Sequence, residues 1–540
     1  MTTFSLGSFG SLTLVEESPS SWRAPSSAEM ATLDQQTISA GVSSLELMER
    51  AGGVVVDAIR EVLPRRGNES KVVVLCGPGN NGGDGLVVAR RLVDDGMSVL
   101  AVLTDASRYS TECRAQLASF PYAVALEGSG EVAHAACCGR SITHNDLAVR
   151  LAEAHLVVDA LLGTGQREAP RGGVRELIEI AMREKVRRPE LIVLSVDIPT
   201  GVDADTGARY SPHVVADFTV SIELLKRGMV QFPGRDACGE IRVVPIGISG
   251  REGIEFGVVE GSARPSMKRR SPAAHKGTQG RVLVIAGSAA MPGASALAVL
   301  GALRSGSGLV SRVTKPSWSG VEVTPECMNV ILDSPQPHYT EDDAAPLVEA
   351  IGAADSVVVG PGLGRDAETG RFVQRCIDSL RAMKKRCVID ADALALISTH
   401  QINLKGLDGV ITPHPGEAAT LLGVSNNDVQ KDRFSSVKKL HELLGVTSLL
   451  KGAGTLVWDG ERGGIIAHGT PYLATAGSGD VLSGILATAL HRCENVFDAT
   501  VCGAYIHAVA GERASQASRG PIIASDVALA AASVVGELER

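Results

Sequence analysis

Residues 474–484 read ATAGSGDVLSG, a run of small residues that carries one carboxylate to the start of an apolar segment. The apolar residues after Asp480 recur at near-helical spacing, which predicts a helix that begins at this aspartate. The backbone N–H groups of residues 477–479 would then face outward at the positive end of the helix dipole, where an anion can bind. This arrangement suits phosphoryl transfer, with Asp480 accepting the proton of an attacking hydroxyl. A glycine turn with a simple aspartate cap has the same pattern, so the remaining sequence has to discriminate between the two.

Length and composition restrict the class of protein. A chain of 540 residues is too long for one core and predicts two large domains. It is 44% hydrophobic and 21% charged and contains 60 glycines, which is typical of a globular α/β enzyme. The net charge of -9 argues against nucleic acid as a partner. No apolar run is long enough to span a membrane. The ten cysteines include no CxxC pair, which indicates a reducing, cytoplasmic compartment.

The first half begins with residues 1–26, which are rich in Ser and Thr and which we expect to be poorly ordered. The apolar spacing predicts a helix over Ser44–Val62, and Gly52 in its middle indicates that another backbone packs closely there. A buried strand follows at Lys71–Cys76. Residues 77–85, GPGNNGGDG, then form a loop that leads into a helix predicted for residues 86–94.

This loop raises the hypothesis of a dinucleotide-dependent dehydrogenase. Gly77, Gly79 and Gly82 satisfy the GxGxxG pattern, and Asp105 follows the next predicted strand where a ribose-binding acid would lie. Asp84 argues against it, because a carboxylate at the helix N-terminus would repel a pyrophosphate. The polar side chains of the loop instead offer contacts to hydroxyls, amides or a hard cation.

Two further strands of the first half end in polar side chains. Asp159 ends the strand LVVD, and Asp197 ends the strand LIVLSVD, with Thr200 three residues later. Ligands of open parallel sheets bind beyond the carboxyl ends of the strands, so these side chains and Asn81 would share one crevice. Their oxygen donors suit a hard cation. Capping or a turn is the simpler explanation for each residue taken alone.

The second half repeats the pattern of strands that end in glycine-rich or polar loops, which predicts another parallel sheet. No GxxxxGK(S/T) motif occurs, so a nucleotide would not be held by a Walker loop. Lys451 and the amides of residues 452–455 are alternative phosphate ligands. His414 lies between two prolines that present it rigidly. Asp390 and Asp392 are candidates for binding Mg²⁺ or for capping a helix.

Together these motifs resemble known families. GPGNNGGDG, DALLGTG and VDIPTGVD resemble the NAD(P)H-hydrate epimerase family. HKGTQGRVLVIAGS, GPGLG, DADAL, TPHPGEA, LKGAGT and ATAGSGDVLSG resemble the ADP-dependent NAD(P)H-hydrate dehydratase family, whose fold is ribokinase-like. The resemblance runs from about residue 27 to the C-terminus, with the motifs in family order, and implies the bifunctional hydrate-repair enzyme typical of bacteria.

The resemblance implies an α/β protein of two three-layer αβα domains, the first Rossmann-like and the second ribokinase-like. We expect the epimerase domain at residues 27–250 and the dehydratase domain at residues 275–540. Between them, residues 251–274 lose periodicity and gain Gly, Pro and basic residues, which predicts a linker.

The resemblance also implies site residues, position by position. In the first domain the damaged cofactor would contact Asn80, Asn81, Gly82, Gly83, Asp84, Gly163, Thr164, Gly165, Gln166, Arg167, Glu168, Ala169 and Asp197. A K⁺ ion would be held by Asn81, Asp159 and Thr200. In the second domain the hydrate would contact Ala294, Gly362, Gly364, His414 and Asp480. The adenine nucleotide would be bound by Lys451, Gly452, Ala453, Gly454, Thr455 and Gly479.

The implied chemistry agrees with these residue types. Hydration places a hydroxyl on the carbon beside the ring nitrogen of NADH or NADPH and abolishes hydride donation. ADP-driven phosphorylation makes that hydroxyl a leaving group, with Asp480 as the base and Mg²⁺ neutralising the nucleotide, and it releases AMP and phosphate. The first domain would interconvert the R and S hydrates with Asp197 as acid or base, either by opening the ring or by losing the hydroxyl transiently.

Three alternatives stay open at this point. The second half alone would be compatible with a vitamin-precursor or sugar kinase. The first half alone would be compatible with a dehydrogenase, or with a catalytically silent binding module. The presence of Asn81, Asp159 and Asp197 speaks against the silent module. The expected partners are hydrated NADH, hydrated NADPH and ADP, bound by a homo-oligomer.

Overall fold

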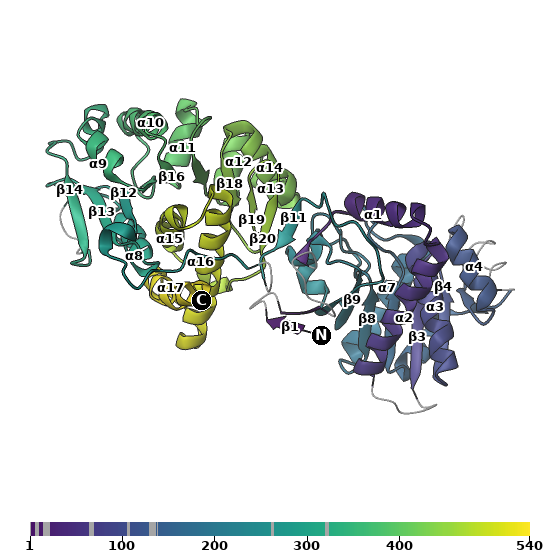
Figure 1. Ribbon diagram of the computed structural model, residues 1–540. Helices are drawn as coiled ribbons and strands as arrows, with labels where there is room; N and C mark the ends of the chain where they lie inside the picture. The colour runs from purple at the N-terminus through teal and green to yellow at the C-terminus, as the bar shows by residue number, and fades with distance from the viewer. Residues whose placement is uncertain are drawn as a thin grey trace. The chain divides into compact units, whose positions relative to one another are not determined.

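The computed structural model describes residues 2–5, 10–14, 22–63, 70–104, 109–128, 137, 139–260, 264–318 and 323–539. These residues form two compact units that divide between Gly257 and Val258. Two ten-stranded sheets organise them (Figure 1).

The first unit is built on a sheet with the order β1-β2-β10-β9-β8-β7-β3-β4-β5-β6. Neighbouring strands are parallel except β1 and β2. The strands are β1 (Thr2–Ser5), β2 (Ser11–Leu14), β3 (Lys71–Cys76), β4 (Ser98–Leu103), β5 (Val124–Leu126), β6 (Ser141–Ile142), β7 (Leu156–Ala160), β8 (Ile192–Val196), β9 (Phe218–Ile222) and β10 (Glu240–Val244). The helices are α1 (Ser27–Ser39), α2 (Ser44–Val62), α3 (Asn80–Asp94), α4 (Thr111–Ser119), α6 (His144–Glu153) and α7 (Gly172–Arg187), with the 3-10 turns η4 (Arg227–Val230) and η5 (Gly234–Ala237). The chain reverses its direction of travel across the sheet between the neighbours β3 and β7.

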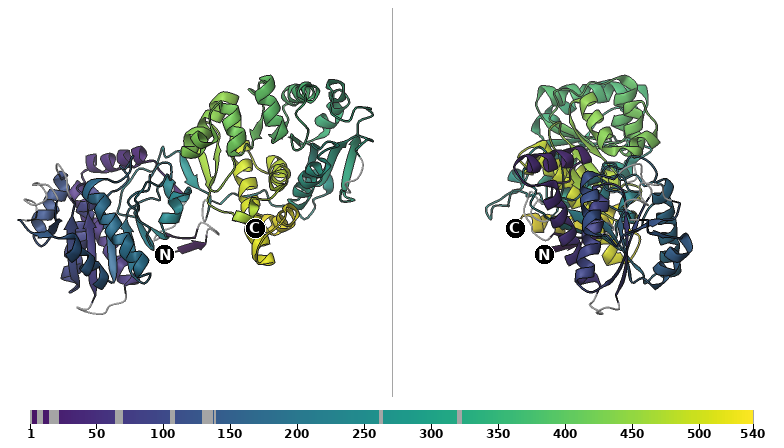
Figure 2. Two further views of the ribbon diagram at one scale, coloured as in Figure 1. Left: turned by 180° about the vertical axis from the view of Figure 1, so that it is seen from behind. Right: turned by 90° about the vertical axis from the view of Figure 1, so that its right-hand side faces the viewer.

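Helices cover both faces of this sheet (Figure 2). Successive side chains of a strand point to opposite faces, and β3 follows this rule. Val72 and Val74 pack in one core with α1 to α4, whereas Val73 and Leu75 pack in another with α6 and α7. The first unit is therefore a three-layer αβα structure, as expected.

The packing of α2 against α3 explains the glycines of both helices. Helix α2 has the predicted bounds, and a Cβ at Gly52 would lie 2.4 Å from Cγ1 of Val87 on α3. Helix α3 begins at Asn80, earlier than predicted, so the second half of the expected loop is helical. Its glycines serve close packing, since a Cβ at Gly82 would lie 1.8 Å from the carbonyl oxygen of Gly77.

The N-terminal segment corrects one expectation. We expected residues 1–26 to be poorly ordered, but β1 and β2 extend the sheet and β2 pairs with β10 in parallel. Trp22 and Ala24 are buried as well. Without β2, strand β10 would leave a row of unpaired N–H and C=O groups at the edge of the sheet, which explains why this polar segment forms strands.

The second sheet has the order β11-β20-β19-β18-β17-β16-β15-β12-β13-β14. It is parallel from β14 to β18 and antiparallel from β18 to β20. The strands are β11 (Phe256–Val258), β12 (Arg281–Ile285), β13 (Leu309–Thr314), β14 (Cys327–Ile331), β15 (Ser356–Val359), β16 (Arg386–Ile389), β17 (Gly409–Ile411), β18 (Thr447–Leu450), β19 (Thr455–Trp458) and β20 (Gly463–Ile466). The helices are α8 (Pro292–Arg304), α9 (Leu347–Ala353), α10 (Ala367–Ala382), α11 (Asp392–His400), α12 (Pro415–Leu422), α13 (Asn426–Lys431), α14 (Arg433–Leu444), α15 (Ser478–Arg492), α16 (Val496–Ser518) and α17 (Ala524–Leu538), with the 3-10 turns η7 (Lys276–Thr278), η8 (Glu341–Ala344) and η9 (Pro471–Leu473). Here the reversal lies between the neighbours β12 and β15.

Helix α15 is the central helix of the second unit. It packs with α8, α16 and α17 on one face of the sheet, in a core that includes Val284 and Val358. Figure 1 shows α9 to α14 on the opposite face. A Cβ at Gly484 of α15 would lie only 1.9 Å from the carbonyl oxygen of Ala298 on α8, so these two helices touch backbone to backbone.

The segment predicted as a linker, residues 251–274, is partly built into folded structure. Strand β11 lies at the edge of the second sheet, and the N–H of Val259 donates to the carbonyl oxygen of Ile465 at 3.0 Å. Met267 is buried in the core of the second unit. Its apolar residues thus find partners across the sheet, which local periodicity does not reveal.

Within the described part of the chain, no helix combines the length and apolar character needed to cross a membrane. The cysteines that the structure describes are all free thiols.

Candidate active sites

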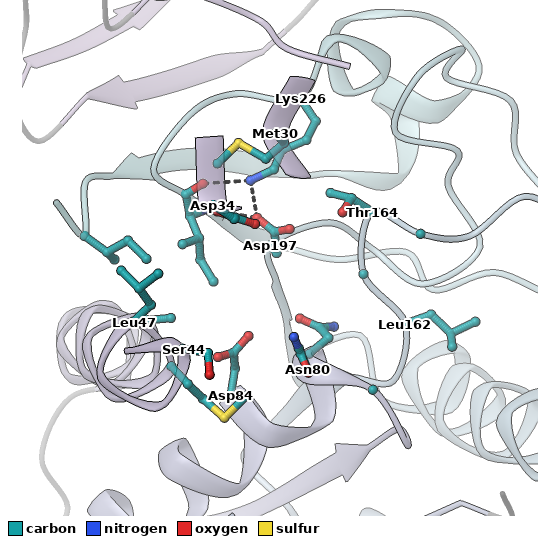
Figure 3. A pocket seen from close by; sticks show the side chains of 18 of the residues that line it. Met30, Asp34, Ser44, Leu47, Asn80, Asp84, Leu162, Thr164, Asp197 and Lys226 are labelled. Atoms are coloured by element: carbon teal, nitrogen blue, oxygen red, sulfur yellow. Dashed lines mark hydrogen bonds and ion pairs between the residues drawn. The ribbon is translucent and has the colours of Figure 1, made fainter. Parts of the chain in front are cut away.

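A cavity of about 520 Å³ in the first unit lies where the strand order reverses (Figure 3). It opens beyond the carboxyl ends of β3 and β7, where open parallel sheets bind their ligands. The first turns of α3 and the loop after β7 form part of its wall, and α1 and α2 contribute further side chains. The predicted contact residues that line it are Asn80, Asn81, Asp84, Gly163, Thr164, Gly165, Gln166 and Asp197.

The other predicted contacts of the first unit do not line this cavity. They are Gly82, Gly83, Arg167, Glu168 and Ala169. The two glycines are packing positions of α3, since a Cβ at Gly83 would lie 2.6 Å from Sδ of Met48. Arg167 forms an ion pair of 2.9 Å with Asp205, and Glu168 pairs with an arginine at the surface. These charged side chains are therefore engaged outside the cavity.

The residues predicted to hold a cation meet at the carboxyl end of β7. Both Oδ1 and Nδ2 of Asn81 are buried without a hydrogen-bond partner among the described residues. Asn81 packs beside Gly163, whose Cβ position lies 3.5 Å from Cβ of Asn81. A buried amide without a partner is costly, which makes this side chain a candidate ligand for a bound group.

Asp159 is fully buried and accepts hydrogen bonds on both oxygens. Oδ2 accepts from Oγ of Ser195 and from the N–H of Thr200, both at 2.8 Å, and Oδ1 accepts from Oγ1 of Thr200 at 2.7 Å. Burial raises the pKa of Asp159, and these hydrogen bonds oppose the rise. The hydroxyl of Thr200 donates its hydrogen bond to Asp159 and its oxygen accepts the N–H of Leu162 at 3.1 Å, which leaves one lone pair of Thr200 for a ligand.

Asp197 is paired with a lysine that the sequence motifs did not indicate. Oδ1 of Asp197 forms a short ion pair with Nζ of Lys226 and accepts the N–H of Ile222 at 3.1 Å. Nζ of Lys226 also donates to the carbonyl oxygen of Ile222 at 2.7 Å, and this lysine is 1% exposed. Asp197 has φ +67°, a left-handed conformation that aspartate tolerates better than most residues. Protonating Asp197 would break this buried ion pair.

Two more carboxyls face the same cavity. Asp84 lies in the second turn of α3, and Asp34 lies on α1. Burial raises the pKa of Asp34 to about 6, with Asp197 adding to the rise and Lys226 opposing it. Burial also raises the pKa of Asp84 well above its usual range, and Asp197 and Asp34 add to it. Asp34 follows no recognisable motif, so the sequence did not identify it.

In the second unit, the predicted phosphoryl-transfer loop lies at the N-terminus of α15. Gly477 is the N-cap with φ +83°, so the helix begins two residues earlier than predicted, and Asp480 lies in its first turn. Burial, together with the charge of Asp390, raises the pKa of Asp480 to about 7, while Lys451 lowers it. The carboxyl of Asp480 can therefore take up and release a proton near neutral pH.

His507 of α16 contacts this loop at Ser478. Its Nε2 lies 3.0 Å from the carbonyl oxygen of Ser478 and 3.1 Å from Oγ of the same residue. Burial lowers the pKa of His507 to about 4, so the ring is neutral at pH 7. A neutral ring that donates from Nε2 holds the carbonyl of Ser478 away from the anion-binding side. Helix α16 lies far from the motifs in sequence, and nothing local indicates this role.

Lys451 lies beside the same loop. Its Nζ is 2.8 Å from Oδ1 of Asp390 and 3.8 Å from Oε2 of Glu417, and 3.5 Å from the Cβ position of Gly479. Burial would lower the pKa of Lys451, but Asp390 and Glu417 outweigh it and raise the pKa. Oδ2 of Asp390 accepts from Oγ of Ser483 at 2.7 Å. Asp390 thus holds Lys451 and α15 rather than standing free as a cation ligand.

His414 is presented by a capping box. Nδ1 of the ring accepts the backbone N–H groups of Gly416 at 3.0 Å and Glu417 at 3.3 Å. The backbone N–H of His414 donates to Oε2 of Glu417 at 2.8 Å. The residue is exposed, and Nε2 of its ring lies 3.5 Å from Oε1 of Glu417. The predicted rigidity of His414 therefore comes from this cap as well as from the prolines.

The other predicted hydrate contacts meet at the reversal between β12 and β15. A Cβ at Gly362 would lie 2.8 Å from Cβ of Ala294, and Gly362 has φ +65°. The N–H of Gly364 donates to Oδ2 of Asp392 at 3.0 Å, and Oδ1 of Asp392 accepts from Arg365 at 2.6 Å. Asp392 therefore fastens the glycine loop after β15 to the start of α11.

The predicted nucleotide loop, residues 451–455, is fixed from inside by Arg433. This buried guanidinium donates to the carbonyl oxygens of Leu450 and Lys451 at 3.3 Å and of Gly454 at 3.4 Å. Burial lowers its pKa to about 10, so it stays charged at pH 7. Arg433 thus holds three carbonyls at the loop from inside, and the N–H of Lys451 donates to the carbonyl oxygen of Pro413 at 2.9 Å. No motif indicated Arg433, which is the first residue of α14 and lies far from the loop in sequence.

Both units are similar to known protein families. Residues 44–228 match the family model described as YjeF-related protein N-terminus, and residues 282–529 match the model described as NAD(P)H-hydrate dehydratase. The bifunctional NAD(P)H-hydrate repair enzyme Nnr of Moorella thermoacetica is 35% identical over 91% of this chain and 92% of its own length. The Escherichia coli enzyme of the same name is 35% identical over 87% of this chain and 85% of its own length. This chain belongs to the bifunctional NAD(P)H-hydrate repair enzyme family.

Solved structures similar to the second unit include the ADP/ATP-dependent NAD(P)H-hydrate dehydratase of Bacillus subtilis, co-crystallised with ATP and Mg²⁺. It is 26% identical, and the match covers 51% of this chain and 95% of that one, with a TM-score of 0.42. A ribokinase-like protein of Enterococcus faecalis is 22% identical and covers 51% of this chain and 92% of that one, with a TM-score of 0.45.

Membership in the hydrate-repair family argues against two of the three alternatives, the kinase and the dehydrogenase. The relatives that match both units are named as hydrate-repair enzymes over their whole length. A sugar kinase fused to a dehydrogenase does not agree with this match. The ribose-binding role considered for Asp105 lies outside the described residues.

Proposed function

We propose that this repair enzyme restores hydrated NADH and NADPH in two steps. The first unit interconverts the R and S hydrates, and the second dehydrates the S hydrate with ADP, releasing AMP and phosphate. The observation that carries the proposal is Asp480, whose pKa is raised to about 7 at the N-terminus of α15. A carboxyl that titrates near neutral pH at the positive end of a helix dipole suits deprotonation of a hydroxyl during phosphoryl transfer.

The residues of the second unit divide this work. Asp480 takes the proton of the hydrate hydroxyl, and the amides of residues 477–479 stabilise the charge on the phosphoryl group in transit. Lys451, held by Asp390, places a positive charge next to these amides. Once the hydroxyl is a phosphate ester, the ring nitrogen expels phosphate and the double bond returns.

Mg²⁺ fits the second unit as an ion shared with the nucleotide rather than as one held by protein alone. Among the described residues no cluster of three His, Cys, Asp or Glu side chains could hold a metal. Mg²⁺ is typically bound by one or two carboxylates together with substrate phosphates, and the candidate carboxylate is Asp392, which the ion would share with Arg365 and the N–H of Gly364. Bound with ADP, it would neutralise phosphate charge.

K⁺ fits the first unit. The partnerless amide of Asn81, the hydroxyl of Thr200 and the carboxylate of Asp159 supply oxygen donors at one point. A K⁺ ion there would offset negative charge beside the cavity. Asn81 would bind it through Oδ1, which gives this buried amide oxygen the partner that the protein does not provide.

The proposal is tested with the full-length Asp480→Asn variant and purified S hydrate plus ADP, by following the absorbance of the reduced nicotinamide. We expect the repair rate to fall by about 100- to 10,000-fold, the usual contribution of a general base. Interconversion of the R and S hydrates, measured by chromatography, stays at the wild-type rate. The matched control is Asp378→Asn, an exposed aspartate on α10. Repair near the wild-type rate in the Asp480 variant would refute the assignment.

Two further proposals concern the state of the protein. We place it in the cytoplasm, as its free cysteines suggest, and we expect a homo-oligomer, as the family resemblance implies. Light scattering of the purified chain measures its mass directly, and a monomer at micromolar concentration would contradict the second point.

A further inference from the structure

Four charged side chains project into the cavity of the first unit, and two of them neutralise each other. Lys226 and Asp197 form a buried ion pair, in which Nζ of Lys226 also donates to the carbonyl oxygen of Ile222. The remaining two are the carboxyls of Asp34 and Asp84. Among the described residues neither of these carboxyls has a hydrogen bond or an ion pair, so both are available to a ligand.

The two available carboxyls come from different sides of the cavity. Figure 3 shows Asp84 rising from α3 at one side, with Asp34 beside Asp197 and Lys226 across the open space. Helices α1 and α3 are anchored separately, α1 by a capping box at Ser26 and α3 by its packing on α2. A substrate ring bound in the open space between them would have Asp84 on one side and Asp34 on the other.

The surroundings of both carboxyls favour proton exchange near neutral pH. Apolar side chains that line the same cavity include Met30, Ile38, Leu47, Met48, Ile222 and Ile248. Burial among them raises the pKa of Asp34 to about 6 and that of Asp84 well above its usual range. The charged groups that face Asp34 are Lys226, which lowers its pKa, and Asp197 and Glu223, which raise it. Glu223 is itself paired with Arg251.

We propose that Asp34 and Asp84 are the proton-accepting and proton-donating pair of the epimerase cavity, one toward each face of the hydrated ring. Asp197, held by Lys226, then serves as a hydrogen-bond acceptor that orients the substrate. This inference rests on the proposed epimerase function. It moves the acid–base role from Asp197, where the motif placed it, to a pair that includes a residue of α1.

The step needs only one water molecule from the solvent, and it releases another. The carboxylic acid of Asp84 gives its proton to the hydroxyl oxygen, the C–O bond breaks and water leaves. The lone pair of the ring nitrogen forms the N=C bond. A water molecule then adds from the other face, a new C–O bond forms, the nitrogen recovers its lone pair and the carboxylate of Asp34 takes the released proton. In the reverse direction Asp34 is the acid and Asp84 the base.

The first test measures conversion of pure R hydrate by the full-length Asp34→Asn variant. We expect kcat/KM to fall by about 100- to 10,000-fold. In the wild type, kcat/KM falls as the pH drops through about 6, because the protonated form of Asp34 cannot accept a proton. This limb of the pH profile is absent from the asparagine variant. Asp34→Glu retains a carboxylate and recovers at least tenfold of the lost rate with the limb restored.

The control variant is Asp57→Asn, an exposed aspartate on α2 in the same unit, which keeps the wild-type rate and pH profile. If the wild type interconverts the hydrates and Asp34→Asn does so equally fast with the same pH limb, the inference is wrong and the proposed function stands. If the wild type does not interconvert them, the proposed function itself fails.

A second measurement tests the written step independently of any variant. Epimerisation by the wild type in water enriched in ¹⁸O incorporates one solvent oxygen per inversion, because the original hydroxyl leaves as water. Inversion with retention of the original oxygen would overturn the step, since it would mean that the ring opens and closes instead.

Discussion

Single residues in the second unit matter mainly through the charges beside them. Asp480 titrates near pH 7 because burial and Asp390 favour its protonated form and Lys451 favours its carboxylate. The same lysine is kept charged by Asp390 and Glu417. The base and the cation of this site are therefore one electrostatic unit, and a change in either shifts the other.

The pH dependence of dehydration follows from this coupling. Asp480 accepts a proton only as the carboxylate, so the rate of S-hydrate repair with ADP falls about tenfold for each pH unit below about 7. Lys451→Met removes the charge that favours the carboxylate, and the falling limb moves to higher pH. Lys439→Met, on the exposed side of α14, is the control and leaves the limb in place. A limb at the same pH in the Lys451 variant would show that the two groups are not coupled.

The buried amide of Asn81, which has no partner among the described residues, leads us to expect that the epimerisation rate of the first unit depends on K⁺. Replacing K⁺ by tetramethylammonium at constant ionic strength slows R-to-S conversion by about tenfold or more, as for loss of a metal-ligand contact. Asn81→Ala lowers the rate in K⁺ and removes its dependence on the cation, because the buried amide oxygen is gone. Equal wild-type rates in the two salts would exclude K⁺ from this site. Chromatography of the two epimers supplies the rates.

At the scale of elements, the contact of α8 with α15 positions the phosphoryl-transfer loop. Both helices approach backbone to backbone at Gly484, and α15 carries Gly477 and Asp480 at its start. His507 on α16 fixes the same end of α15 through Ser478. The geometry of the loop is thus set by neighbouring helices as well as by its own glycines.

Gly484→Ala tests this contact. The added methyl group would lie 1.9 Å from the carbonyl oxygen of Ala298, so the helices must separate. We expect a loss of about 1–3 kcal/mol in unfolding free energy, the usual cost of overpacking, and slower dehydration. Gly536→Ala on α17 is the control, because no atom lies within 4 Å of its Cβ position and alanine favours a helix. Thermal unfolding that leaves Gly484→Ala as stable as Gly536→Ala would contradict the packing argument.

At the scale of the molecule, the cavity of the first unit and the α15 site of the second are each formed by residues of one unit. The cavity residues of the first unit and the α15 site of the second share no described side chain. Each site should therefore work when the other is inactive in the same chain.

Mixing two variants tests this independence. Asp480→Asn keeps the epimerase and Asn81→Ala keeps the dehydratase, so neither alone repairs R hydrate at the wild-type rate with ADP. An equimolar mixture restores repair, because the S hydrate formed by one chain diffuses to the other. Recovery of the reduced-nicotinamide absorbance is the readout. A mixture no faster than the Asn81 variant alone would mean that the two sites must share one chain.

Much of both sites could be predicted because motifs are contiguous. Residues 474–484 predicted a helix with a carboxylate at its N-terminus, and SGDVLSG is helical with Asp480 in the first turn, although the helix begins two residues before Asp480. Helix Ser44–Val62 and strand Lys71–Cys76 have the predicted bounds, because their apolar periodicity is strong. The start of α3 was predicted too late, since glycines that signal a loop locally are required here by helix packing.

The sequence by itself determined the α/β class, the two units and the carboxylates at the ends of strands, because these depend on local periodicity and on motifs within a few residues. The tertiary structure alone decided which side chains come together: Lys226 with Asp197, His507 with Ser478, and Asp34 opposite Asp84. These partners lie on separate elements, and only the folding of the sheet brings them within reach. Their pKa values follow from burial, a property of the folded chain that no local pattern of residues encodes.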